Sequence, residues 1–338
     1  ILCTDRRAGA PTPHMLYEGN MGMTSRKPIL VTGSHRSGST WVGRMISASP
    51  SVGYIHEPFN PTFIPSACGA KFVYWYTYIT DENESTYYYK HIKDTIEFRY
   101  NINTIIKNII GGLKVVRSRE HAKRVLRAYK SFSTYRSRKA TPLVKDPIAF
   151  FSAEWLYKRF DMNVLVLIRH PAAFASSLKR LNWVCPFSSL LQQPLLMRDY
   201  LYSFEAQIKE YSNEEHDVID EAILFWRIIH QVIIEYQSNH EDWIFLRHED
   251  ISRDPLHHFQ NLFKRFDLDF SQHVRTVIQE NTDPSNPSEA PESAADFTKR
   301  DSKSSIWNWK NRLTESEIER IREQVEDISK EFYSDSDW

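Results

Sequence analysis

The sequence contains no apolar run long enough to cross a membrane, and it contains little cysteine. Its longest apolar runs are short segments such as Val164 to Ile168 and Phe72 to Ile79, whereas a membrane span requires roughly 18 residues. Cys3, Cys68 and Cys185 are far apart and form no Cys/His cluster, which argues against a disulfide framework and against a zinc site. We therefore expect no membrane span, no bound metal and a reducing, cytoplasmic compartment.

An excess charge of one sign is also missing, and flexible residues are few. The chain has 43 basic and 43 acidic side chains, so it is not a general binder of nucleic acid. Its 338 residues include only 10 Gly and 16 Pro, against 41% apolar residues, which excludes a disordered or collagen-like chain. The first residues follow no pattern. We expect a tail or remnant over residues 1–27 and one folded domain over residues 28–338.

Short apolar runs alternate with helical periodicity along most of the chain. Five of these runs are typical of buried parallel strands: Ile29–Thr32, Val52–Ile55, Leu143–Val144, Val164–Ile168 and Trp243–Leu246. The alternation predicts the α/β class, with a central parallel sheet of about five strands flanked by helices. Residues 222–236 predict a helix packed inside the domain. Asp254 and Thr314 are predicted to cap the starts of two later helices.

Two segments depart from this alternation. Aromatic residues crowd Phe63 to Tyr100, and they predict either a lid or acceptor pocket or a packed helical subdomain. Leu113 to Asp146 holds 11 basic and 2 acidic residues. This stretch is either a solvated helix face, opposite an apolar stripe, or a surface that attracts an anion. The expected stripe consists of Ala122, Val125, Leu126 and Tyr129. We assign residues 63–142 to the lid or acceptor side of the domain.

The most informative segment is a Gly/Ser-rich loop between the first strand and the first helix. Such a turn directs backbone N–H groups and a helix N-terminus toward an anion. Gly33 and Gly38 have the spacing of a nucleotide-triphosphatase phosphate loop, but Ser39 stands where that pattern has Lys. The loop's cation is Arg36 instead. A triphosphatase would also end an apolar strand in Asp to help hold magnesium, whereas the strongest strand here is followed by Arg169.

Six motifs resemble, in the same order, those of sulfotransferases that use 3′-phosphoadenosine-5′-phosphosulfate (PAPS). They are Arg36–Trp41, Tyr54–Pro58, Leu167–Pro171 with Ser176 and Ser177, Arg247–Pro255, Thr298–Lys303 and Trp309–Leu313. Their style is closest to bacterial and carbohydrate sulfotransferases. The resemblance implies an enzyme with a P-loop-like phosphosulfate-binding loop. It would transfer a sulfuryl group from PAPS to a hydroxyl of a carbohydrate, lipid or other small molecule, and would release PAP and a sulfate ester.

The resemblance also implies a donor site without a metal. The loop around the 5′-phosphosulfate would comprise His35, Arg36, Ser37, Gly38, Ser39, Thr40 and Trp41. Arg169 and Ser177 would hold the 3′-phosphate, and a guanidinium with a hydroxyl is a suitable phosphate receptor. Residues 297–338 would cover the nucleotide. The candidate contacts in that segment are Lys299, Arg300 and Lys303.

Sulfuryl transfer needs a base for the acceptor hydroxyl and cations at the leaving phosphate. Glu57 is our candidate base, because it follows a short strand at the carboxyl edge of the sheet, and His56 is its rival. Arg36 would stabilise the leaving phosphate. Lys145 could neutralise the bridging oxygen and Asp146 could act as a second base, or the two could form a structural ion contact. The alternative functions are a small-molecule kinase and a non-catalytic nucleotide-binding module.

Overall fold

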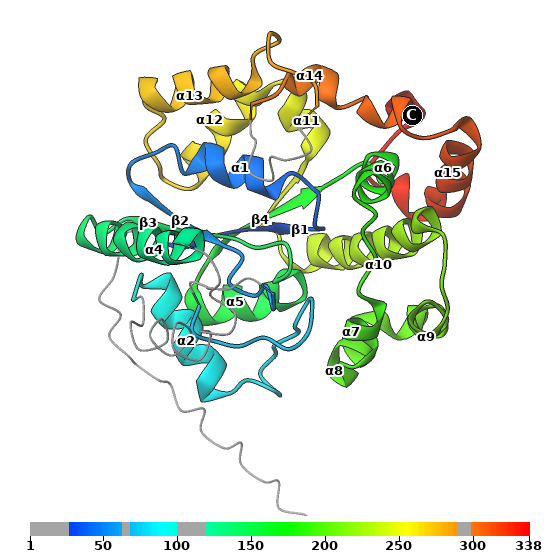
Figure 1. Ribbon diagram of the computed structural model, residues 1–338, viewed down its shortest axis with the longest axis horizontal. Coiled ribbons are helices and arrows are strands. Elements are labelled where there is room, and N and C mark those ends of the chain that lie inside the picture. The colour runs from blue at the N-terminus through cyan, green and yellow to red at the C-terminus, as the bar shows by residue number, and fades with distance from the viewer. Residues whose placement is uncertain (1–26, 63–67, 100–118, 290–298) are drawn as a thin grey trace, which may run out of the picture.

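A five-stranded parallel sheet forms the centre of the molecule. The computed structural model describes residues 27–62, 68–99, 119–289 and 299–338 (Figure 1), so the expected tail lies almost wholly outside the described residues. The strand order is β2-β3-β1-β4-β5, and all neighbouring pairs run parallel. The strands are β1 (Ile29–Gly33), β2 (Val52–His56), β3 (Thr141–Lys145), β4 (Asn163–Ile168) and β5 (Ile244–Arg247). This confirms the predicted fold class and places each strand close to its expected position.

The inner strands are apolar along their whole length because both of their faces are covered. In β1, Ile29 and Val31 belong to the core beneath α1 (Ser39–Ile46), while Leu30 belongs to the core on the opposite face. Side chains alternate between the faces of a strand. A continuous apolar run is therefore the expected sequence of a strand with a core on each side.

Helices cover both faces of the sheet (Figure 1). One face carries α1, α11 (His248–Arg253), α12 (Pro255–Arg265), α13 (Gln272–Thr282) and α14 (Ser302–Ser305). The other α-helices in the described ranges are α2 (Thr86–Ile96), α4 (Arg119–Ser137), α5 (Ala153–Phe160), α6 (Pro171–Leu181), α7 (Phe187–Leu191), α8 (Pro194–Leu196), α9 (Glu205–Asn213), α10 (Val218–Asn239) and α15 (Glu315–Ser329). Within the described ranges, none of the helices has the length and apolar character that a membrane crossing would need.

The two predicted helix caps are present. The Asp254 carboxylate accepts a hydrogen bond from the His257 N–H at the start of α12. Thr314 and Glu317 form a reciprocal capping box at the start of α15, in which each side chain accepts from the other residue's backbone N–H. The predicted buried helix is α10, whose central side chains lie in the core. These elements were readable from sequence because their signals are local.

The predicted apolar stripe of α4 was wrong for the residues whose side chains are described. Leu126 is 70% exposed and Tyr129 is 40% exposed, whereas Phe132 is buried. Phe132 packs edge-on against Phe98, with ring centroids 5.5 Å apart. The helix lies beside the edge strand β2, and over residues 126–137 Phe132 is the apolar side chain that is buried. Ala122 and Val125 lie outside the residues whose side chains the structure describes.

The aromatic segment before α2 contributes mainly to the core. Phe72, Tyr76 and Tyr78 are buried. Phe72 stacks on Phe59, with ring centroids 4.4 Å apart, and the Tyr78 hydroxyl donates to Asp199 over 2.9 Å. These contacts favour the packed-subdomain interpretation of residues 68–99 over an acceptor pocket lined by these three rings.

The strand order determines where a ligand can enter. From β1 the chain continues to β2 on one side of the sheet, and from β4 it continues to β5 on the other side. The loops that follow β1 and β4 therefore separate at adjoining strand ends. This divergence opens a crevice at the carboxyl edge, which is the usual ligand position in open α/β sheets.

Candidate active site

A pocket lies at the carboxyl ends of β1, β4 and β5 and holds about 1020 Å³ of empty space, its open mouth included. It is lined by Arg36, Gly38, Ser39, Thr40, Trp41, Arg169, Ala173, Ser176, Ser177, Arg180, His248, Ser252, Asn281, Arg300, Ser302, Ser305, Asn308, Trp309 and Arg312. Five of these residues are arginines, and none of the described lining residues is an Asp or Glu. The charge of the lining therefore favours a ligand with several negative charges.

Two glycines give the loop after β1 its shape. Gly33 has a φ of 131°, and a Cβ there would lie 2.3 Å from the Leu167 carbonyl oxygen of β4. Gly38 has a φ of 91°, and a Cβ there would lie 2.3 Å from the His248 Nδ1 atom. Both positions thus combine a left-handed backbone with a close approach, which only glycine accommodates.

The N-terminus of α1 opens into the pocket without a side-chain cap. Its N-cap residue is Gly38, which supplies no side-chain acceptor. The N–H groups of Ser39, Thr40 and Trp41 occupy the first helical turn, where the helix itself provides no acceptor, and all three residues line the pocket. The Ser37 hydroxyl is buried without a hydrogen-bond partner among the described residues. This arrangement suits an anion at the helix N-terminus.

Arg36 projects from the same loop and is held by two neighbours. Its Nε donates to the Ser177 hydroxyl over 3.0 Å, and its guanidinium carbon lies 5.4 Å from the centre of the Trp183 ring. Burial, followed by the charges of nearby arginines, lowers the pKa of Arg36 to about 10. Its backbone φ is 65°, a left-handed conformation that costs energy in a non-glycine residue. The side chain is therefore charged, fixed and incompletely neutralised at neutral pH.

Arg169 lies where β4 ends and shares the pocket with Ser177 of α6. Its Nε lies 3.5 Å from the Glu249 Oε1 atom. Burial lowers the pKa of Arg169, and the charge of Glu249 opposes that effect. Arg300 adds a third partly buried cation, and burial together with the neighbouring arginines lowers its pKa to about 10. Placing these like charges close together costs free energy, which an anionic ligand would recover.

A second polar group lies at the ends of β2 and β3. The Lys145 ammonium is buried and donates to the Glu57 Oε1 atom over 2.5 Å, and the Asn60 amide donates to Oε2 over 2.9 Å. Burial acts to raise the pKa of Glu57, but the charges of Lys145 and His56 and these hydrogen bonds outweigh it, so the pKa is lowered. The charge of Glu57 in turn acts on the pKa of Arg36. Glu57 is therefore an ionised carboxylate close to the anion pocket.

The structure places Asp146 and His56 differently from Glu57. Asp146 is fully buried, and its carboxylate accepts the backbone N–H groups of Phe59, Ile148 and Ala149. Burial, followed by the charge of Glu57, raises the pKa of Asp146 to about 7. The His56 Nε2 lies 4.0 Å from the Glu57 Oε2 atom. Asp146 thus shapes the turn that carries Glu57, and His56 lies beside that carboxylate.

A profile described as the sulfotransferase family matches residues 28–272. The chain belongs to the sulfotransferase family. No curated protein matches it. Solved structures with a similar fold include the sulfotransferase domain from the curacin biosynthetic pathway, which is 15% identical with a TM-score of 0.44, the match covering 89% of this chain and 99% of that one. A mouse sulfotransferase complexed with PAP is 12% identical with a TM-score of 0.46, and the match covers 92% of this chain and 86% of that one.

Four of the candidate donor contacts in this sulfotransferase are not among the residues that line the pocket: His35, Ser37, Lys299 and Lys303. The ring of His35 lies against Tyr76 and Phe174, and its Nδ1 is 2.6 Å from the Tyr76 hydroxyl. Burial, with the charge of Arg36, lowers the pKa of His35 to about 3, so this ring is neutral. Lys299 and Lys303 are exposed, and of the three candidates in the C-terminal segment only Arg300 lines the pocket.

Sequence reasoning missed several pocket residues of the sulfotransferase, chiefly Arg180, His248 and Arg312. Arg180 had a usable signal, because Ser176, Ser177 and Arg180 recur at the spacing that shares one face of a helix. Arg312 lies in the last motif that carried the family resemblance. His248 lies in the motif Arg247–Pro255, but its place in the pocket depends on the close approach of Gly38, which is distant in sequence.

Proposed function

We propose that this sulfotransferase transfers the sulfuryl group of PAPS to a hydroxyl of a small-molecule acceptor such as a carbohydrate, lipid or natural product. The observation that carries the proposal is the combination of five arginines with an uncapped helix N-terminus, in a lining whose described residues include no carboxylate. A phosphate monoester carries up to two negative charges near neutral pH. A nucleotide with a 3′-phosphate and a 5′-phosphosulfate therefore matches this lining in charge.

The two ends of the donor would contact different elements. The 5′-phosphosulfate would lie at the N-terminus of α1 beside Arg36, where backbone N–H groups have no helical acceptor. The 3′-phosphate would lie between Arg169 and Ser177, which both line the pocket. Arg300 would close the pocket from the C-terminal segment. The 5′-phosphosulfate, which carries the sulfuryl group that is transferred, would then lie on the side of the pocket nearer Glu57.

The chemical step follows from these positions. The acceptor oxygen attacks sulfur and forms a new S–O bond, while the bond from sulfur to the bridging oxygen of the 5′-phosphate breaks. The electron pair of that bond stays on the phosphate of the leaving PAP, where Arg36 and the loop N–H groups stabilise the charge. The acceptor proton passes to Glu57, whose ionised state Lys145 maintains. The products are PAP and a sulfate ester.

A small-molecule kinase is the main competing function, and the residues of the pocket argue against it. A kinase uses carboxylates to hold magnesium at its phosphates. The described lining of this pocket supplies arginines at the corresponding places, including Arg169 after β4. A guanidinium binds an additional anionic group of the ligand and repels a divalent cation.

The proposal is tested by calorimetric titration of the protein with PAP and with adenosine 5′-phosphate, in the presence of a chelator. We expect PAP to bind at least about tenfold more tightly, because a hydrogen bond to a charged group contributes about 1.5–3 kcal/mol. Arg169→Ala should abolish the preference without changing the affinity for adenosine 5′-phosphate. Equal binding of the two nucleotides, or tight ATP binding that requires magnesium, would contradict the proposal. A labelled-sulfate transfer assay against carbohydrate, lipid and phenolic hydroxyls then identifies the acceptor class.

A further inference from the structure

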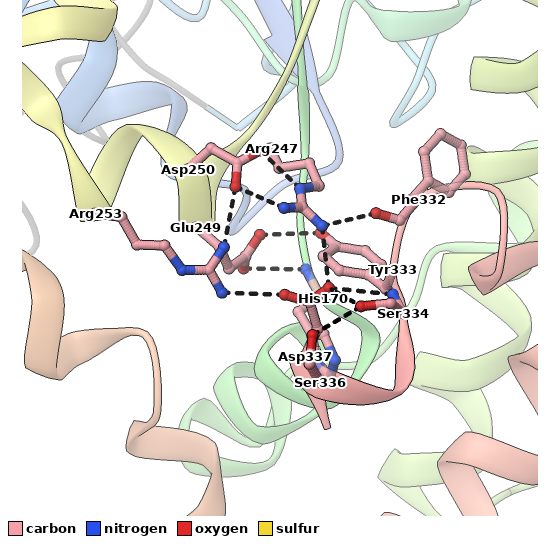
Figure 2. A network of polar contacts seen from close by, with 10 residues as sticks. All are labelled: His170, Arg247, Glu249, Asp250, Arg253, Phe332, Tyr333, Ser334, Ser336 and Asp337. Carbon is pink, nitrogen blue, oxygen red and sulfur yellow. Dashed lines mark hydrogen bonds and ion pairs between the residues drawn. The ribbon is translucent and has the colours of Figure 1, made fainter.

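The segment after α15 contacts the residues behind the donor pocket. Figure 2 shows Tyr333 and His170 converging on the carboxylate of Glu249. The Tyr333 hydroxyl donates to Oε2 over 2.9 Å, and the His170 N–H donates to Oε1 over 3.1 Å. Glu249 is 2% exposed and Tyr333 is 6% exposed. Both carboxylate oxygens of Glu249 therefore have assigned partners inside the protein.

Arg169 meets this carboxylate from one side only. Its Nε lies 3.5 Å from Oε1, a distance beyond a hydrogen bond. No hydrogen bond of its two terminal nitrogens is found within the described ranges, and Arg169 lines the donor pocket. A free carboxylate beside a guanidinium tends to form two parallel hydrogen bonds with it. Here the Tyr333 hydroxyl on Oε2 and the His170 N–H on Oε1 fix the orientation of the carboxylate, so that only Oε1 faces Arg169.

Further ion pairs fix the position of Tyr333 (Figure 2). Arg247 donates to the Phe332 carbonyl over 2.8 Å and to the Asp337 carboxylate over 3.2 Å. Arg253 donates to the other oxygen of Asp337 over 3.0 Å. Asp250 accepts hydrogen bonds from both arginines. Since Phe332 and Asp337, which precede and follow Tyr333, are bound to arginines of β5 and α11, its hydroxyl has little freedom to leave Glu249.

We propose that Tyr333 is a positioning residue that sets the donor selectivity of the pocket. By holding Oε2 of Glu249, it keeps that carboxylate from rotating into the orientation that would pair both of its oxygens with the Arg169 guanidinium. The terminal nitrogens of Arg169 are thereby left for the 3′-phosphate. This inference rests on the proposed function, because it assumes that Arg169 binds the 3′-phosphate of the donor.

Tyr333→Phe tests the inference by removing the hydroxyl and little else. We expect the Kd for PAP to rise about tenfold, while the Kd for adenosine 5′-phosphate stays within twofold of the wild-type value. Tyr200→Phe is the matched control, because the Tyr200 hydroxyl also donates to a carboxylate, that of Glu154, over 2.7 Å. It should leave the affinities for both nucleotides unchanged.

Glu249→Gln separates positioning from a purely structural role. A neutral amide cannot form the ion pair that competes for Arg169, so we expect this variant to bind PAP at least as tightly as the wild type. The double variant Y333F/E249Q should then recover most of the affinity that Y333F loses. A structural role would instead weaken PAP binding in both single variants and would add their effects.

The possible results distinguish this inference from the proposed function. If the wild-type protein shows no preference for PAP over adenosine 5′-phosphate, the proposed function fails. If the wild type shows the preference and Tyr333→Phe retains it, or if Tyr333→Phe weakens both nucleotides equally, the positioning role of Tyr333 is overturned. Should Tyr333→Phe not fold, weaker PAP binding by Glu249→Gln alone would also overturn it.

Discussion

Glu57 combines a buried cation partner with a left-handed backbone, with a φ of 42°. Its carboxylate is ionised next to Lys145 and lies near Arg36. If it takes the acceptor proton, Glu57→Gln should lower the rate of sulfuryl transfer by roughly 10²-fold or more. Because the amide retains the shape of the side chain, PAP affinity should stay within about twofold. Single-turnover transfer and calorimetry on the same preparation provide the two readouts.

His56→Gln is the control for Glu57, since the His56 ring lies 4.0 Å from the same carboxylate. We expect this variant to retain transfer within a fewfold of the wild type. Full activity in Glu57→Gln together with a large loss in His56→Gln would assign the base to His56. Loss of PAP binding in Glu57→Gln would instead indicate that unpairing Lys145 disturbs the fold of the site.

For single residues, the sequence predicted which side chains supply charge to the site better than it predicted their hydrogen-bond partners. Arg36 and Arg169 were identifiable as cations because each follows an apolar strand, Arg36 within a Gly/Ser-rich loop. The partner of each was not identifiable. Ser177, expected beside Arg169, accepts a hydrogen bond from Arg36, and Asp146 is occupied by three backbone N–H groups. Side-chain partners depend on tertiary placement, which no local pattern encodes.

The loop from β1 to α1 requires glycine at position 38, where α1 begins. Gly38→Ala would place a methyl group against the His248 ring and would force alanine into a left-handed conformation, which costs about 1–2 kcal/mol before the clash is counted. We expect PAP affinity to fall at least tenfold, because the loop N–H groups would move. Equilibrium denaturation and PAP titration measure the two effects.

Gly38→Ala/His248→Ala separates the two causes in that loop. The double variant removes the clash and keeps the backbone strain, so it should regain part of the lost stability. If Gly38→Ala binds PAP with wild-type affinity, the N-terminus of α1 does not hold the phosphosulfate.

Elements with local signals were predictable, and elements that depend on their neighbours were not. The strands and the caps at Asp254 and Thr314 follow from short patterns within the chain. The face that α4 covers was predicted wrongly, because the Phe98 ring and the sheet edge select Phe132 rather than Leu126. The pocket itself combines the loop after β1, α6, α11 and the C-terminal segment, and only the fold brings these together.

For the molecule as a whole, buried neutral histidines make the free energy of unfolding depend on pH. His170, His230 and His248 are buried. Burial lowers the pKa of His170 and His230 to about 3 and that of His248 well below its ordinary value. The unfolded chain protonates these rings below about pH 6.5, and the folded protein does not. The stability that they contribute is therefore present above about pH 6.5 and is lost as the pH falls toward 3.

Asp146 acts in the opposite direction. Its folded-state pKa is about 7, so between about pH 4 and 7 the folded protein holds a proton that the unfolded chain releases. His35, whose pKa is also lowered to about 3, adds a fourth ring, so four histidines less this carboxyl leave about three protons taken up on unfolding. The free energy of unfolding should then fall by about 4 kcal/mol per pH unit below pH 6, since each proton contributes about 1.4 kcal/mol per unit.

Urea unfolding at several pH values between about 7.5 and 5 measures this slope. His230→Phe should reduce it by one proton, because the His230 ring is fully buried and is stacked on Trp226. The exposed His257 is the matched control, and His257→Gln should leave the slope unchanged. If the free energy of unfolding of the wild type does not change across this interval, the buried rings take up protons in the folded state. That result would contradict the conclusion that His170 is neutral in the core against which the C-terminal segment packs. His230→Phe also alters packing, but a packing change shifts the free energy of unfolding equally at every pH. The slope against pH is therefore the quantity that tests the titration of His230.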